Sequence, residues 1–600
     1  MKKTMNTWIR RVTLGAFITM NLALGAAEKP SPQSAETHSV KPDWSKFDWD
    51  KLNAQALAEY TRPVRPGIPG KFPFLNVRSK HHQGHMYAPN FDFGAVPGAK
   101  HYRFTVAHWD AGKKVLADKT WVFEAPDPWA SLAPVWTELP VCLMPGEGLS
   151  PNRPEKTGDT WLRLTVEGLD GPGGKPVGKA KIGTAEMLEF RKAQPFQGPL
   201  EQPKTTLREA CLHAIRQTAK DDTTYQFCRD YRLPIEGPRG PALAKFQNVE
   251  GVFIHMVMIV GSTIPFLAKE SKDPDEVAMA IKTARNAADT IINTSTPPDW
   301  KYGHFPLTLR NRGKHWNAYL AGEKTYEEWL ADMHAQSAGG YVMTQDCRTD
   351  DIALWSLDVY DVTKDAKYLD AAKRLAATWR DTQLPSGIWP FSVKPVTGEK
   401  WWARAKHRGD YPPALTIWFL DRLATQYGVR DYEQTADRAF NWVLENQVKP
   451  LDLRAHFHDA GPGPRSSQGA LAASEIAMVL FNRAARDKNA EYTAMGEEIV
   501  RWIEDWFIRW EADGTVLEQS RDRADVAFTA GGVVQAYVKA HEMTGNPLYL
   551  AKALRMANRL MGDWVNKSGY GWSFYSAPRA AVCLLEAYPY LKKHNLPGGE

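Results

Sequence analysis

One pattern recurs four times in the second half of the chain and constrains its fold more than any other feature. A short polar turn precedes a tyrosine, and alanine-rich apolar positions follow at steps of three and four residues. Apolar residues at these steps line one side of an α-helix, so each copy predicts an amphipathic helix. The copies are "DAKYLDAAKRLAATW" (365–379), "RDYEQTADRAFNWV" (430–443), "NAEYTAMGEEIVRWIEDWF" (489–507) and "NPLYLAKALRMANRLMGDWV" (546–565).

The copies recur at a nearly constant interval, since the tyrosines at 368, 432, 492 and 549 lie 64, 60 and 57 residues apart. The segment 273–292 is similar but has no tyrosine. A second helical pattern precedes each copy: "DDIALWSLDVYDVT", "PALTIWFLDRLATQYG", "QGALAASEIAMVLFNRAARD" and "VAFTAGGVVQAYVKAHEMTG". Two helices in every 60 residues or so predict stacked helical hairpins.

Long links rich in Trp, His, Gly and Pro join the hairpins, such as "PSGIWPFSVKPVTGEKWWARAKHRGDYPP" and "NKSGYGWSFYSAPR". Long links alternating with short ones are typical of a closed ring, with the long links gathered on one face. Over about 205–595 the chain resembles the six-hairpin glycosidase and toroid polysaccharide lyase group. The resemblance implies a mainly α protein, an (α/α) toroid of about six hairpins, with a catalytic domain over 200–595.

The N-terminal third is organised differently. Residues 1–27 have the basic start, short apolar run and small residues of a secretory signal, which predicts a secreted or periplasmic protein. Residues 28–70 are polar and proline-punctuated, as in a linker. Over 71–192, apolar residues alternate in "HYRFTVAHWD" and "TWLRLTVEGLD", which predicts a small β-sandwich accessory domain. The phrase "VPGAKHYRFTVAHWDAGKK" resembles fibronectin type III-like modules.

Charge and cysteine content limit the partners. The net charge is +6 and the pI is near 8.8, but no block of Lys and Arg of the kind that binds nucleic acid is present. An acidic oligo- or polysaccharide fits this charge; no transmembrane span and no protein partner are evident. The five cysteines form no CxxC pair, and buried free thiols are favoured over a Cys211–Cys228 disulfide. We predict no cofactor.

A segment of 56 residues, 294–349, interrupts the hairpin rhythm with weak helical periodicity. A structureless link of this size is usually functional. We therefore expect a lid or wall of the funnel that holds Tyr302, His304, His315, Asn317 and Arg348.

Two reactions fit the candidate residues. Hydrolysis requires paired carboxylates: Asp350 and Asp351 start a predicted helix, where they either only cap it or act as acid or base, with Glu475 or Asp525 as second carboxylate. β-Elimination of a uronate chain requires a neutralising group (Asn317, Arg348), a base (His315, His456 or His458) and an acid (Tyr575 or Tyr302). Arg579 is either a substrate clamp or a salt-bridge partner.

The stretch "LRAHFHDAGPGPRSSQG" links two predicted hairpins and allows three interpretations. His456 and His458 could belong to a metal site, to a catalytic centre together with Arg465, or to a hinge. Because no third His or Cys lies nearby in the sequence, we predict no metal site.

The rim link 384–412 carries Trp389, Trp401 and Trp402 beside Lys406 and His407. Indole rings flanked by cations suit stacking on acidic sugars, although such a link can also simply cover the hairpin below. We favour a polysaccharide lyase acting on a uronate-containing glycan, with an inverting six-hairpin glycoside hydrolase and a non-catalytic glycan-binding protein as alternatives.

Overall fold

The structure is a computed structural model. It describes residues 46–65, 84–110, 119–142, 160–200, 205–247, 253–307, 314–343, 349–401, 413–451, 453, 469–517, 530–566 and 573–599. Within these ranges it gives the backbone alone at 253–256, 343, 512, 562–566 and 573–579. The predicted signal peptide, 1–27, lies outside the described residues.

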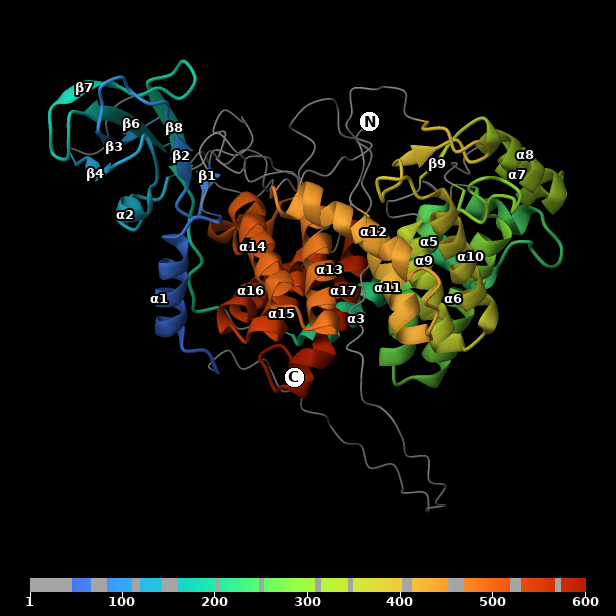
Figure 1. Ribbon diagram of the computed structural model, residues 1–600. Helices are drawn as coiled ribbons and strands as arrows, with labels where there is room; N and C mark the ends of the chain where they lie inside the picture. The colour runs from blue at the N-terminus through green and yellow to red at the C-terminus, as the bar shows by residue number, and fades with distance from the viewer. Residues whose placement is uncertain are drawn as a thin grey trace, which may run out of the picture.

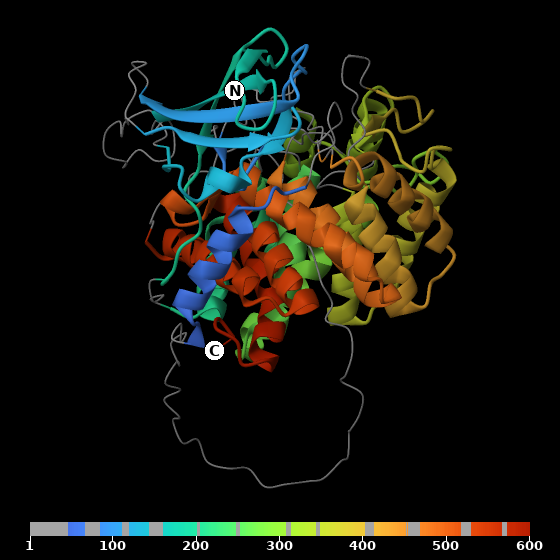
Figure 2. The same ribbon diagram turned by 60° about the vertical axis from the view of Figure 1, so that its left-hand side comes forward.

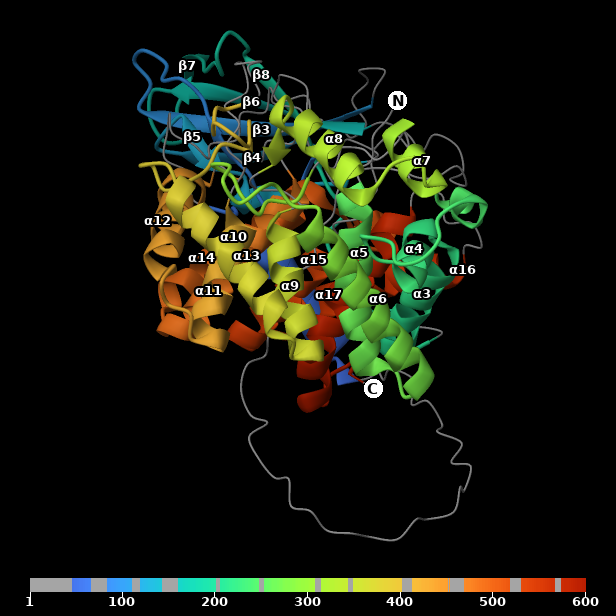
Figure 3. The same ribbon diagram turned by 90° about the vertical axis from the view of Figure 1, so that its right-hand side faces the viewer.

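Six inner helices form a closed ring. Figures 1 and 3 show the helices of the toroid from the side. Each helix packs against the next, and the last packs against the first, which confirms the predicted toroid. Most of their residues are buried on all sides, as expected for helices enclosed by a second layer. In ring order they are α5 (Phe253–Glu270), α9 (Asp350–Thr363), α11 (Ala414–Tyr427), α13 (Ala470–Asp487), α15 (Ala530–Thr544) and α17 (Ser573–Lys593).

Six outer helices each pair with one inner helix. The first of them, α3 (Leu207–Asp221), packs on α17, so the two ends of the domain together build the sixth hairpin and close the ring. The other five follow their inner partners directly in the chain: α6 (Pro274–Asn293), α10 (Ala366–Thr382), α12 (Glu433–Val443), α14 (Ala490–Phe507) and α16 (Pro547–Asn566).

The repeated tyrosine joins neighbouring outer helices. Tyr368 at the start of α10 donates its hydroxyl to Asp289 of α6 at 3.2 Å, and Tyr432 donates to the Lys373 carbonyl of α10 at 3.2 Å. Tyr549 of α16 donates to Glu497 of α14 at 3.0 Å. The fourth tyrosine, 492, packs its ring edge-on against Phe440 of α12. In each copy the tyrosine therefore contacts the preceding outer helix, although the contact itself differs.

Two glycines let inner helices approach closely. A Cβ added to Gly261 of α5 would lie 1.8 Å from the Trp355 ring of α9. A Cβ added to Gly531 of α15 would lie 2.5 Å from the Cα of Ala580 in α17. Because no side chain fits in either place, the ring requires glycine at both.

Short turns join five of the inner helices, α5, α9, α11, α13 and α15, to their outer partners, always at the end of the inner helix. Lys364, Gly428 and Lys488 end α9, α11 and α13 in the left-handed conformation, which reverses the chain within a few residues. The long links therefore gather at the opposite end, where the inner helices begin. We call that end the mouth and the end with the short turns the base.

The link 294–349 is more regular than the sequence analysis expected. It contains α7 (Lys314–Ala321), α8 (Tyr326–Ala338) and β9 (Val342–Met343). Thr325 and Glu328 form a capping box that starts α8, a signal present in "TYEE" and overlooked beside the weak apolar periodicity. Trp316 packs α7 onto Phe246 of η2 (Pro241–Phe246), which contacts α4 (Thr223–Asp230). β9 pairs with β10 (Ser392–Val393) of the next link.

The described part of 84–192 contains a six-stranded sheet and a small two-stranded one; the sheet is seen in Figure 2. The predicted alternation is confirmed: Phe104, Val106, Leu162 and Leu164 are all buried on one face. The large sheet has the order β1 (Gly84–His85), β8 (Met187–Lys192), β6 (Thr160–Leu169), β3 (His101–Asp110), β4 (Trp121–Ala125), with β7 (Pro176–Lys179) also on β6. The small sheet pairs β2 (Asn90–Asp92) with β5 (Trp129–Ser131), near α2 (Ala133–Trp136). The fibronectin type III-like assignment stays a prediction.

Part of the predicted linker 28–70 is a helix. Asp48 caps α1 (Trp49–Tyr60), and Leu52, Ala56 and Tyr60 are buried along one side at four-residue steps. This side packs against α16. The linker prediction is therefore wrong for this stretch, because the surrounding prolines outweighed a short apolar period.

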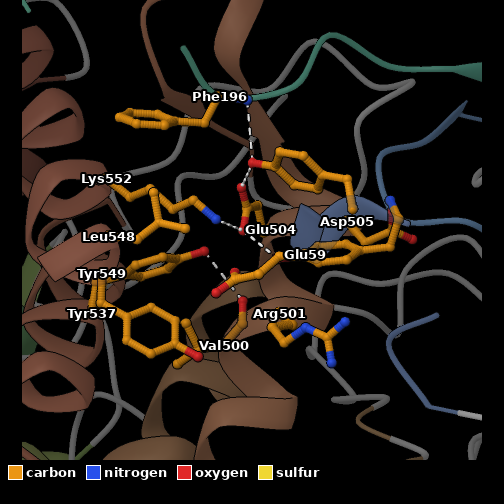
Figure 4. A network of polar contacts seen from close by, with 12 residues as sticks. Glu59, Phe196, Val500, Arg501, Glu504, Asp505, Tyr537, Leu548, Tyr549 and Lys552 are labelled. Atoms are coloured by element: carbon orange, nitrogen blue, oxygen red, sulfur yellow. Dashed lines mark hydrogen bonds and ion pairs between the residues drawn. The ribbon is translucent and has the colours of Figure 1, made fainter. Parts of the chain in front are cut away.

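A buried carboxylate anchors these N-terminal elements to the toroid (Figure 4). Glu504 of α14 accepts hydrogen bonds from Tyr60 of α1 at 2.5 Å and from Tyr87, just after β1, at 2.6 Å. Lys552 of α16 and the indole of Trp510 donate to the same carboxylate at 2.7 and 2.9 Å. Burial, and then the charge of Glu504, raise the pKa of both tyrosines, so the hydroxyls remain donors.

The four described cysteines, 142, 211, 228 and 583, are buried free thiols, as favoured from the sequence. Burial raises the pKa of Cys142 to about 11, which keeps the thiol protonated and unreactive at neutral pH. Within the described ranges, no helix is long and apolar enough to cross a membrane.

Candidate active site

Two adjacent carboxylates lie in the first turn of α9, at the mouth of the ring. Asp350 and Asp351 are 0% and 2% exposed, and the cap position itself belongs to Thr349. The helix dipole favours negative charge here, whereas removal from water disfavours it. Helix capping needs only a residue at the cap position, which is Thr349. It therefore does not explain why two acids are buried next to it.

A third carboxylate lies on α13. Glu475 is 0% exposed, in the second turn of the helix. Residues 475, 479 and 482 share one helix face, because they are four and seven positions apart. Val479 and Asn482 line a cavity at the base of the ring, so Glu475 lies on the same side of α13 as this cavity, nearer the mouth.

A hydrogen-bonded polar pair lies between α15 and α17. Gln535 donates its amide to Glu586 at 2.6 Å, and both side chains are buried. Gln535 precedes Lys539 by one turn and Glu542 by two, and both of these line the same base cavity. The inner surface therefore carries polar groups from α9, α13, α15 and α17 above the base.

Ion pairs close the base. The cavity there has a volume of about 390 Å³ and lies among α11, α13 and α15. Arg422 bonds Asp358 and Asp361 of α9, each at 2.8 Å, and Arg483 bonds Asp421 and Asp437. Burial raises the pKa of Asp421 although Arg483 and Arg486 oppose the shift. Because Arg422 and Arg483 are already paired with carboxylates, we interpret these ion pairs as structural: they close the base of the ring and form a plug there.

His315, predicted as a base, lies on the rim. Its side chain is 43% exposed on α7, and Nδ1 lies 2.7 Å from the Asp332 carboxylate of α8. Lys324 pairs with the same carboxylate, and its hydrogen bond is the main cause that lowers the pKa of Asp332. Asn317, on the same short helix, has a buried amide oxygen. These contacts tie α7 to α8 and do not bring His315 to the helix starts.

Two predicted substrate-binding residues are core residues. The Trp389 ring is fully buried and donates its N–H to the Trp379 carbonyl at 2.8 Å. Tyr302 is buried with its ring edge-on to Phe305, and burial raises its pKa. Neither offers a face to a ligand, so the stacking and acid roles predicted for them are wrong; the apolar rings fill the space under the links instead.

Trp401, predicted as part of a sugar platform, lies beside a second aromatic ring. Its ring stacks on Tyr341 with centroids 5.8 Å apart and an interplanar angle of 24°, and both residues are partly exposed. The β9–β10 pairing brings these two links together. The sequence analysis missed Tyr341 because its partner lies 60 residues away in the chain.

Several predicted site residues lie outside the described residues: Arg348, Trp402, His456, His458, Arg465 and Asp525. Tyr575 and Arg579 lie within α17, where the backbone alone is described. Gln535 and Glu586 were missed; the available signal was a single polar residue within the apolar runs "GGVVQAYV" and "AVCLLEAY". Among the residues that the structure describes, no three His, Cys, Asp or Glu side chains are grouped to hold a metal ion.

Neither known protein families nor curated proteins match this sequence. Solved structures resemble it at low levels. A family 76 glycoside hydrolase from a bovine Bacteroides thetaiotaomicron strain has 11% identity and a TM-score of 0.41, covering 82% of this chain and 97% of its own. The cellobiose 2-epimerase from Spirochaeta thermophila DSM 6192 has 9% identity and a TM-score of 0.45, covering 65% and 100%. An unsaturated glucuronyl hydrolase specific for heparin has 11% identity and a TM-score of 0.39, covering 64% and 98%. At these values the likenesses carry no argument about the reaction of this chain.

Proposed function

We propose that this protein is an exported carbohydrate-active enzyme that hydrolyses glycosidic bonds, with Asp350 and Asp351 in its acid–base machinery. One observation carries the proposal: two adjacent buried carboxylates in the first turn of an inner helix, at the mouth of a closed ring. Burying a carboxylate lowers the stability of the folded protein. Proteins keep such unfavourable groups mainly at functional sites.

The chemistry requires two carboxyl groups. One protonates the departing oxygen of the glycosidic bond, and the other activates water or attacks the sugar. Neighbouring helix residues point about 100° apart, so Asp350 and Asp351 face different directions from one turn. On α9, Asp351 lies on the same helix face as Trp355 and Asp358, because these residues are four and seven positions further along. We place the second carboxyl group at Glu475 on α13, two inner helices further around the ring.

The β-elimination reaction favoured by the sequence requires His or Tyr as base and acid. Of the residues assigned to it, the structure describes the side chains of His315, Tyr302 and Asn317. The first is held on the rim by Asp332 and the second lies in the core. The burial of Asp350, Asp351 and Glu475 supports hydrolysis, and for this reason we prefer it.

The test is to incubate the full-length secreted protein with a panel of neutral and uronate-containing polysaccharides. New reducing ends, without the ultraviolet absorbance of an unsaturated uronate, are expected. Appearance of that absorbance in step with the reducing ends would replace hydrolysis by β-elimination. Retention on a polysaccharide gel with no new ends on any substrate would refute both reactions and leave a binding protein.

A further inference from the structure

A small antiparallel sheet lies at the mouth, where two long links meet. β9 pairs with β10, and the chain after β10 turns back so that the Trp401 N–H donates to the Ser392 carbonyl at 3.0 Å. We call the three segments of this sheet the rim sheet: 341–343, 392–394 and 399–401. In Figure 1, β9 stands above α9 and α10. Met343, the last residue of β9, precedes Asp350 by seven residues, and a chain of that length spans at most about 25 Å.

The two faces of the rim sheet differ in burial. Residues directly opposite each other in an antiparallel pair point to the same face, and successive residues alternate between faces. Val342 and Val393 are opposite each other and are both 0% exposed, so their face is covered by protein. Tyr341 precedes Val342 by one position and therefore belongs to the other face. Trp401 belongs to that face too, because its backbone partner Ser392 is next to Val393.

The two aromatic side chains meet across β10. Tyr341 and Trp401 come from the segments on either side of this strand, and their rings stack with centroids 5.8 Å apart. Ser392 lies on the strand between them and is 1% exposed, as expected if the rings lie over it. Both aromatic residues remain partly exposed. The rim sheet therefore presents a joined aromatic surface whose backbone is fixed by pairing on both sides of β10.

An ion pair flanks the rings on the same face. The register of β10 with β9 continues to place Lys394 opposite Tyr341. The Lys394 N–H donates to the Glu399 carbonyl at 2.8 Å, and the ammonium of Lys394 bonds the Glu399 carboxylate. Their side chains are 37% and 63% exposed. Because Glu399 balances the charge of Lys394, the two side chains add hydrogen-bonding groups to the aromatic surface without adding net charge.

We propose that the exposed face of the rim sheet is a sugar-binding subsite for a pyranose unit of a neutral glycan. Aromatic rings stack on the apolar faces of sugar rings, and Lys394 and Glu399 supply a donor and an acceptor for sugar hydroxyls. A uronate would place its carboxylate beside that of Glu399, where like charges repel. The choice of a sugar over other ligands rests on the proposed function; the geometry of the rim sheet does not. The subsite binds the glycan whose chain reaches the carboxylates at the start of α9.

The test is electrophoresis in native gels that contain a neutral glycan (mannan, dextran or mixed-linkage glucan) or polygalacturonate. All proteins carry Asp350→Asn, so that the polymers are not degraded. Retardation is expected in at least one neutral gel. There, Trp401→Ala and Tyr341→Ala should each raise the apparent dissociation constant about tenfold, whereas Trp401→Phe, which keeps a ring, should raise it less. Neither alanine variant should change migration in polygalacturonate, where a basic protein is retarded by its net charge.

The ion pair has its own substitution. Glu399→Gln leaves Lys394 without its counter-charge on the aromatic face and should strengthen retardation by polygalacturonate. Glu138→Gln is the matched control, because it removes the partner of Lys119 and changes the net charge equally. Equal migration of these two variants in polygalacturonate would overturn the role given to the ion pair in selecting neutral sugars.

Tyr360→Ala is the matched control for the aromatic substitutions. Tyr360 is partly exposed and contacts the Tyr427 ring with centroids 5.7 Å apart, but it lies at the base, so this variant should bind as the parent protein does. Absence of retardation in all three neutral gels would overturn the proposal, and so would equal migration of Tyr360→Ala, Trp401→Ala and Tyr341→Ala. Loss of polygalacturonate retardation in Trp401→Ala would overturn the assignment to a neutral glycan.

Thermal melting of each variant shows whether it folds. Because binding is measured without turnover, this proposal and the proposed function can fail separately. Retardation that depends on Trp401, with no reducing ends from the wild type, would refute hydrolysis alone. Reducing ends from the wild type, with binding unchanged in Trp401→Ala, would refute the subsite alone.

Discussion

Replacement of Glu504 by Gln tests how the N-terminal elements are joined to the toroid. The carboxylate is almost fully buried and accepts from Tyr60, Tyr87, Trp510 and Lys552, the last of which is also fully buried. Glutamine has the same shape and retains one acceptor oxygen, but it leaves the ammonium of Lys552 without a counter-charge. Breaking a buried ion pair in this way costs about 3–5 kcal/mol.

This free energy converts into a measurable shift in melting temperature. For a chain of 600 residues that unfolds as a unit, an entropy of about 2.1 cal/mol/K per residue gives about 1.3 kcal/mol/K. The loss should therefore lower Tm by about 2–4 °C in differential scanning calorimetry. If α1 and the sheet unfold separately from the toroid, the first transition should move by more.

Two variants decide whether the buried charge is the cause. Glu504→Gln combined with Lys552→Met removes both members of the buried ion pair and should recover most of the lost stability, since neutral residues of similar size replace such pairs at little cost. Glu138→Gln removes a surface partner of Lys119, with both side chains more than half exposed, and should change Tm by less than about 1 °C. A Glu504→Gln protein that melts with the wild type, or a double variant less stable than the single one, would refute the reasoning.

The same network predicts a pH dependence. Burial alone would raise the pKa of Glu504, but Lys552 and the two tyrosine hydroxyls hold it below its usual value. The unfolded chain therefore binds the proton more readily, so the contribution is full above about pH 4.3 and is lost as the pH falls through the folded pKa. The stability of the wild type relative to the double variant should therefore fall on acidification through this range.

Three further substitutions follow from the packing. Gly261→Ala should force α5 away from Trp355 and cost about 1–3 kcal/mol in urea unfolding, whereas Gly339→Ala, with no atom nearer than 3.9 Å, should cost little; equal effects would contradict the close approach of the inner helices. Arg422→Gln should cost about 3–5 kcal/mol, because it leaves Asp358 buried without its cation, and an unchanged urea midpoint would refute the plug at the base. Burial lowers the pKa of Lys192 from 10.5 to about 8, so wild-type stability should rise between pH 8 and 10.5 as the unfolded chain holds the proton longer; Lys192→Met should remove that rise, and a variant that keeps it would show another group to be responsible.

The helices of the ring were predictable because their pattern is local. The apolar steps in 350–363 and 489–507 give α9 and α14 almost to the residue, and the tyrosine interval gives the hairpin period. Closure of the ring by α3 and α17, at opposite ends of the domain, follows from the number of hairpins and not from any motif. The helix α1 was missed because Pro and polar residues around it obscured three apolar positions.

The site was less predictable because its residues come together only through tertiary structure. Asp350 and Asp351 could be named from a helix start, but Gln535 and Glu586 have no shared motif and meet only because α15 and α17 are neighbours. Trp389 and Trp401 looked alike in one link, yet one is buried in the core and the other stacks on Tyr341. Composition cannot separate a core tryptophan from a surface one when both lie in loops.

The central claim is that Asp350 and Asp351 perform acid–base chemistry, and the direct measurement is kcat for Asp350→Asn and Asp351→Asn on the best glycan substrate. Loss of a general acid or base lowers kcat by about 10²–10⁴-fold, and asparagine keeps the shape of the side chain. Asp365→Asn is the control, because Asp365 caps α10 at the base and asparagine caps equally well. We predict a loss of at least about 10²-fold in one or both mouth variants, with melting temperatures near that of the wild type and full activity in Asp365→Asn. Turnover within about twofold of the wild type in both mouth variants would contradict the account.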